Sequence, residues 1–131
     1  MMEMDNIYLK VPAKPEYMLV IRLTTSAVAS RAGFGVDEIE DIKLAVSEAG
    51  TYVMNHDRSI EWLELTFKVD KEKGMWIDIF ASKSVHRDVP FFDDEQIELS
   101  FYIMQSLMDV VEKTMDNGVL RGIKMYKKYG G

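Results

Sequence analysis

The spacing of apolar residues changes near residue 60, and this change constrains the fold more than any other feature of the chain. Before it, apolar residues recur at the three- and four-residue intervals of one helix face: Ile39, Ile42, Val46, Ala49 and Val53. After it, apolar residues alternate with polar ones: Leu63, Leu65, Phe67 and Val69, then Met75, Ile77 and Ile79. A helix followed by an antiparallel hairpin is predicted, with its turn at residues 70–74.

The N-terminal part predicts a strand and two helices. Residues 6–11 (NIYLKV) have the composition of a short strand. Residues 17–31 predict a helix that ends at Gly33, because glycine commonly follows the last helical turn. Asp37 with Glu40 resembles a capping box, which would start the helix that carries the apolar stripe described above.

The C-terminal part predicts a third helix and a second hairpin. Residues 81–96 form a polar, irregular connection, in which Asp93 and Gln96 are candidate helix caps. Apolar residues then share one helix face: Ile97, Phe101, Met104, Met108 and Val111. Asn117-Gly118 predicts a tight turn before a last strand at 119–125. Residues 1–131 thus predict one α+β domain, a two-layer α/β sandwich with a mixed, mostly antiparallel sheet and about three helices on one face.

Composition excludes several classes of function. The chain has no cysteine, so disulfides and thiolate metal sites are excluded, and a reducing cytoplasm is the expected location. No apolar run approaches the roughly 20 residues that span a bilayer, and residues 1–10 lack the apolar core of a secretory signal. The net charge of -6 argues against nucleic acid as a partner. His56 and His86 have no metal-ligand spacing, so we expect no metal site.

Several segments of the sequence resemble one family of bacterial regulators. They are KVPAKPEY (10–17), IRLT (21–24), VASR (28–31), DEIED (37–41), AVSEA (45–49), YIM (102–104) and LMD (107–109). Together they resemble the anti-sigma-factor serine kinases of the RsbW type, which belong to the GHKL superfamily of ATP-binding proteins. The resemblance implies that superfamily's α/β sandwich and a nucleotide site built from three motifs.

The first motif is a helix that carries a catalytic Glu and, one turn later, an Asn that holds magnesium. Residues at i and i+4 lie one above the other on a helix, so base and metal ligand converge on one phosphate. Glu48 matches the Glu, but Tyr52 occupies the Asn position. A phenol is a poor magnesium ligand, and Asn55 lies another turn, roughly 5 Å, further along the axis.

The other two motifs are also altered. An Asp-x-Gly motif after the third strand recognises adenine in the family, but Ala81 and Lys83 stand at its Asp and Gly positions. A glycine-rich turn before the third helix closes on the phosphates in the family. The matching residues, 97–100, contain no glycine, and Glu98 would bring negative charge close to a polyphosphate.

Three altered motifs on a retained scaffold predict a regulator that binds proteins and has no cofactor. Glu48 is then a vestigial base, and the resemblance implies a sigma factor or a STAS-type anti-anti-sigma protein as partner, with a homodimer also open. One alternative is an active serine kinase that uses ATP, magnesium, Glu48 and Asn55. Another is a domain that binds a different small ligand in a pocket lined, or filled, by Tyr52, Phe80 and Phe101.

Arg22 is the candidate partner-binding residue. It lies within the first predicted helix, between apolar Ile21 and Leu23. The resemblance implies that this helix contributes to the family's protein-binding surface, and arginine suits a desolvated interface with an acidic partner. A surface arginine whose stem lies along the helix is the alternative.

Overall fold

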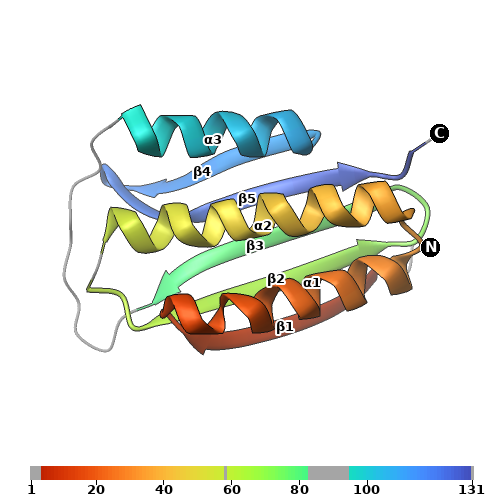
Figure 1. Cartoon of the computed structure of the whole chain (residues 1–131), viewed down its shortest axis with the longest axis horizontal. Coiled ribbons are helices and arrows are strands. Elements are labelled where there is room, and N and C mark those ends of the chain that lie inside the picture. Colours follow the sequence, from red (N-terminus) through yellow and green to blue (C-terminus); the bar gives the residue numbers. More distant parts are fainter. Residues whose placement is uncertain (1–3, 58, 83–94, 131) are drawn as a thin grey trace.

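A five-stranded sheet is covered on one face by three α-helices (Figure 1). The computed structural model describes residues 4–57, 59–82 and 95–130, the side chains of 95–97 excepted. The strand order is β1-β2-β3-β5-β4, and each neighbouring pair is antiparallel. The predicted α+β sandwich is confirmed, although the described sheet is antiparallel throughout rather than mixed.

The elements follow one another in the predicted order. No helix within the described ranges is both long and apolar enough to cross a membrane. The bounds are β1 (Met4–Pro12), a short 3-10 helix η1 (Pro15–Tyr17), α1 (Met18–Ala32), α2 (Val36–His56), β2 (Trp62–Asp70), β3 (Gly74–Ser82), α3 (Glu95–Leu107), β4 (Val110–Asp116) and β5 (Val119–Lys128).

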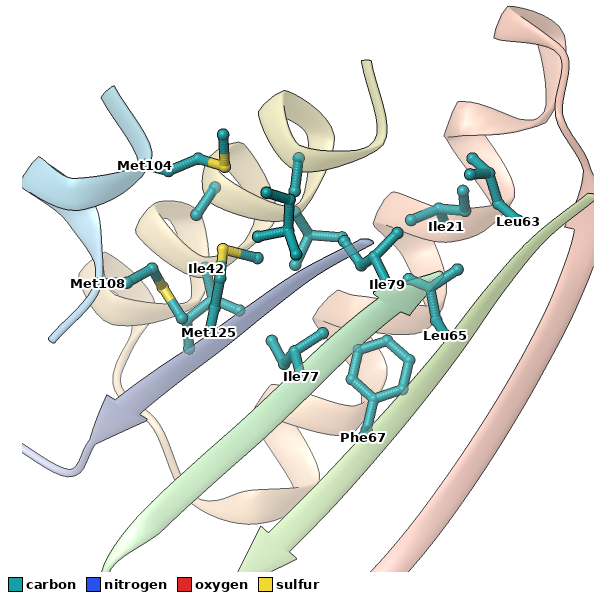
Figure 2. Packing of buried hydrophobic residues seen from close by; sticks show 14 of the residues in the cluster. Ile21, Ile42, Leu63, Leu65, Phe67, Ile77, Ile79, Met104, Met108 and Met125 are labelled. Carbon is teal, nitrogen blue, oxygen red and sulfur yellow. The ribbon is translucent and has the colours of Figure 1, made fainter. Parts of the chain in front are cut away.

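The core lies between the sheet and the helical layer. Alternate strand residues such as Leu65, Ile77 and Ile79 point from the sheet toward the helices (Figure 2). Met104 of α3 and Ile42 of α2 enter the same cluster from the opposite side. In Figure 1, α2 lies between α1 and α3. Because α2 is the central helix, it contacts α1 on one side and α3 on the other.

The start of α2 differs from the prediction. The N-cap residue is Gly35, and the Glu38 carboxylate accepts a hydrogen bond from the Gly35 N–H at 3.0 Å. Glu38 also accepts a hydrogen bond from the Gly130 N–H at 2.8 Å. The predicted capping box of Asp37 and Glu40 is therefore wrong by two residues. The prediction looked for an N-cap residue with a side-chain acceptor, whereas glycine, which has none, is also a favourable N-cap residue.

The third helix ends earlier than its apolar spacing predicts. It closes at Leu107, and Met108 donates the last helical hydrogen bond to the Met104 carbonyl at 3.0 Å. Val111 belongs to β4, where it pairs with Met125 of β5. The β-branched pair Val110-Val111 favours the strand, so the predicted helical stripe ended one turn too late. Asp93, the predicted cap, lies outside the described residues.

Both predicted turns are present. Asp70 accepts hydrogen bonds from the backbone N–H groups of Glu72 and Lys73, which closes the turn between β2 and β3. Asn117 and Gly118 both have positive φ, 51° and 77°, the combination that a type I′ turn requires. The two hairpins set the strand register and place the C-terminal end of β3 and the N-terminal end of β5 beside the end of α2.

Candidate functional site

Tyr52 is buried at the place where α2 faces α3. Its side chain is 1% exposed, although it follows half-buried Glu48 by only one helical turn. The ring centroid lies 6.1 Å from that of Phe101 on α3, with a tilt of 46°. This geometry suits an aromatic pair, so Tyr52 is part of the contact between the two helices.

Lys113 brings a positive charge to this aromatic contact from β4. It is paired with buried Ile123 of β5 and therefore lies on the sheet face that the helices cover. Its Nζ is 3.1 Å from Glu98 Oε1, 4.6 Å from the Phe101 ring centroid and 6.0 Å from that of Tyr52. Tyr52, Glu98, Phe101 and Lys113, called the Tyr52 cluster below, thus join three elements.

The cluster alters the protonation of two side chains. Burial lowers the pKa of Lys113, but hydrogen bonding to Glu98 and interaction with Tyr52 outweigh burial and hold the pKa above its ordinary value. His56, one turn beyond Tyr52, is 9% exposed. Burial and the charge of Lys113 lower the pKa of His56, against an opposing effect of Asp57. The two shifts act in opposite directions: the pKa of Lys113 is raised and the pKa of His56 is lowered.

Glu48 and Asn55 do not join Tyr52 in one site. The Glu48 carboxylate makes no hydrogen bond or ion pair with the described residues. Asn55 is exposed and lines a separate cavity of about 300 Å³ beside η1 and α1, together with Pro15 and Met18. Tyr52 and Asn55 therefore lie on different sides of α2, Tyr52 toward α3 and Asn55 toward α1.

A second cavity, of about 350 Å³, lies where α2, β3 and the β4–β5 hairpin meet. Ala81, at the predicted adenine-recognition position, lines it; Lys83, the other residue of that motif, lies outside the described residues. The Ser82 hydroxyl is buried and makes no hydrogen bond with the described residues. The remaining lining residues are Val53, His56, Asp57, Ile60, Asp116, Leu120 and Arg121.

Phe80 takes no part in either place. It alternates with inward-facing Ile79 along β3, so it lies on the uncovered face of the sheet, and it is 36% exposed. The prediction that Phe80 lines or fills the pocket is therefore wrong. Phe101, which was predicted to line or fill the same pocket, instead lies against Tyr52.

Arg22 lies on α1, which presents apolar side chains to solvent. Leu19 and Leu23 are 54% and 60% exposed, and Val20 is also exposed. Arg22 is half-buried beside them and forms no ion pair with any described residue. The outward side of α1 around Leu19, Val20, Arg22 and Leu23 is called the α1 face below.

Comparison with known proteins identifies the family. Residues 11–125 match the family model described as the histidine kinase-like ATPase domain, which agrees with the observed sandwich and defines the class of protein. The serine-protein kinase RsbW of Bacillus subtilis (strain 168) is 37% identical, covering 93% of this chain and 86% of that relative. The serine-protein kinase RsbW of Staphylococcus epidermidis is 38% identical, covering 95% and 89%. Within the histidine kinase-like class, the chain belongs to the RsbW family.

The chemistry at the Tyr52 position differs from the ligand set that magnesium prefers. Magnesium prefers oxygen ligands in octahedral geometry, whereas Tyr52 offers a buried phenol packed on Phe101. The Lys113 ammonium lies 6.0 Å from the centroid of the Tyr52 ring, and its positive charge repels a cation. Among the described residues, no three acidic or histidine side chains are grouped as metal ligands.

Lys113 is the site residue that sequence reasoning missed. The predicted helix extended to Val111, so Lys113 was placed in a loop and could not be assigned to a face of the sheet. Had Val110, Val111 and Thr114 been taken as a strand preceding the Asn117-Gly118 turn, alternation would have placed Lys113 on the helix-covered face.

Proposed function

We propose that this RsbW-family chain is an anti-sigma-factor-like regulator that acts in the cytoplasm by binding proteins and does not use ATP. The Tyr52 cluster is the observation that carries the proposal. It fills the contact between α2 and α3 with two rings and an ion pair, at the position that the family resemblance assigns to the magnesium ligand. Without a metal ligand and an adenine-binding carboxylate, Glu48 has no bound phosphate to act on.

The α1 face supports the protein-binding part of the proposal. A helix that packs one side on the core and exposes leucines on the other has apolar surface that a partner can cover. The sequence of α1 contains Arg22 and Arg31 and no acidic residue, although the whole chain has a net charge of -6. We therefore assign an acidic, partly apolar protein surface to this face, as a sigma factor or a STAS-type anti-anti-sigma protein would offer.

Calorimetric titration with ATP and magnesium tests the proposal directly. The wild-type protein and Tyr52→Asn are each titrated, and Lys124→Ala, changed on the uncovered face of the sheet, is the control. We expect no binding in the micromolar range by the wild-type protein. Micromolar binding, or transfer of phosphate to a purified STAS-type protein, contradicts the proposal and favours the kinase alternative.

That kinase alternative has weaker support. It needs Glu48 and Asn55 to act on one metal-bound phosphate, but Asn55 lines the cavity beside α1 while Tyr52 occupies the side of α2 that faces α3. A shared magnesium site would require oxygen ligands only about 2 Å from the ion. If the proposal holds, Asn55 binds no magnesium, so Asn55→Ala should not change any weak nucleotide binding that the wild-type protein shows.

The cavity at Ala81 favours a second candidate function, the binding of another small ligand. Its volume of about 350 Å³ falls within the range of small-molecule sites. His56, Asp57 and Ser82 supply polar groups along its wall. Screening nucleosides, nucleotides and organic acids by their effect on the melting temperature tests this candidate, with Ala81→Leu as the variant whose larger side chain blocks the cavity.

A further inference from the structure

We propose that Lys113 is a built-in cation that holds the start of α3 on α2, so that this chain keeps α3 in place without any bound ligand. The inference rests on the proposed function, because it assumes that no nucleotide occupies the site. It concerns a single contact, in which side chains of α2, α3 and β4 meet around one charge.

The geometry gives Lys113 three simultaneous interactions. Its ammonium is within ion-pair distance of Glu98, and it lies over the Phe101 ring at 4.6 Å. It also lies near the Tyr52 ring, 6.0 Å from the centroid. Glu98 and Phe101 are three residues apart on α3, so they occupy the same side of that helix and face the ammonium together.

The ion pair is less exposed than an ordinary surface pair. The side chains of Lys113 and Glu98 are 22% and 27% exposed. By contrast, those of Lys71 and Asp5 are 62% and 60% exposed. Solvent and salt screen an enclosed pair less, and removing one partner leaves the other charge partly buried and unpaired. Loss of the Lys113 charge therefore releases Glu98 and Phe101 together.

The uncovered face of the sheet provides a matched control. Lys124 of β5 lies over the Trp76 ring at 4.8 Å, nearly the distance from Lys113 to Phe101. Both residues of this second contact belong to the sheet, so it connects no helix. Substituting Lys124 removes a cation–π contact of the same kind and leaves α3 with all of its contacts.

The experiment compares Lys113→Met with Lys124→Met in the full chain. Methionine keeps the apolar stem and removes the charge. Hydrogen exchange of the backbone amides of residues 98–107 and the melting temperature are measured with and without millimolar ATP and magnesium. For Lys113→Met we expect about tenfold faster exchange in α3 and a melting temperature lower by about 4 °C. Lys124→Met should leave exchange in α3 unchanged.

The outcomes separate this inference from the proposed function. Unchanged exchange in α3 of Lys113→Met, or an equal increase in Lys124→Met, overturns the role of Lys113. Added protection of wild-type α3 by ATP and magnesium overturns the proposed function instead. If Lys113→Met does not fold, Glu98→Gln provides the test: exchange should increase in residues 98–107 and not in α1, and unchanged exchange overturns the inference.

Discussion

The two sides of the helical layer around α2 differ in how much apolar surface they expose. On the flank toward α3, Tyr52 is 1% exposed and packed into a cluster with an ion pair at its centre. On the other side of the helical layer, α1 leaves Leu19 and Leu23 more than half exposed. Side chains of the protein itself fill the contact between α2 and α3, whereas the outward side of α1 leaves apolar surface exposed.

This difference predicts that stability and affinity for a partner depend on different residues. Residues of the Tyr52 cluster contact the core, so changing them alters the free energy of unfolding. Residues of the α1 face contact solvent, and surface substitutions usually change that free energy by no more than about 0.5 kcal/mol. If the two flanks have the roles assigned here, substitutions on one should affect stability and those on the other should affect affinity for a partner.

The largest effect is expected from Tyr52→Ala. Deleting a buried aromatic side chain removes its apolar contacts and leaves a cavity, so the free energy of unfolding should fall by about 3 kcal/mol. Urea denaturation followed by circular dichroism measures the change. Leu23→Ala, also a truncation of a large side chain, is the control and should remain within about 0.5 kcal/mol of the wild-type value. Equal losses in both variants would remove the distinction between the flanks.

A smaller effect, on affinity rather than stability, is expected from Arg22→Ala. Arginine at the centre of an apolar patch commonly contributes to the interface, so affinity for a purified sigma factor or STAS-type protein that binds the wild-type chain should fall about tenfold. Arg31→Ala is the control, because Arg31 has the same charge but lies in the last turn of α1, beside Asp5 and Lys71. Surface plasmon resonance at two salt concentrations measures both variants. An equal loss for Arg31→Ala would indicate a general charge effect.

The sequence predicted the fold well where one local rule dominated. Alternation in β2 and β3 placed Leu65 and Ile77 on the buried face, and Asn117-Gly118 gave the last hairpin. It failed where two rules compete. Val111 fits both helical spacing and a strand, and its pairing with Met125 of β5 decides between them. Such pairing depends on residues distant in sequence, which single-sequence periodicity does not contain.

The candidate site was less predictable than the fold. Glu48, Tyr52 and Asn55 are close in sequence and on similar helical angles, so spacing alone groups them. Their separation depends on which neighbour each one meets: α3 buries Tyr52, whereas the region of η1 and α1 leaves Asn55 exposed. A helical wheel gives directions around one helix and says nothing of the helices packed beside it.

The smallest effect is expected from the pH dependence of stability at His56, which follows Tyr52 by one turn of α2 and lines the cavity at Ala81. Burial, reinforced by the Lys113 charge, lowers its pKa in the folded state below the ordinary value of 6.5. As pH falls through 6.5, the unfolded chain binds a proton that the folded chain binds only at lower pH, so the stability should decrease. Below the folded-state pKa both forms are protonated, and this contribution no longer changes. Urea denaturation at pH 7.5 and 5.5 should therefore show a smaller pH-dependent loss for His56→Gln than for the wild-type protein, while the carboxylates contribute equally to both. Titration of the His56 ring by NMR checks the cause. In Lys113→Met the pKa of His56 should rise toward 6.5. An unchanged pKa would mean that the charge of Lys113 does not affect His56.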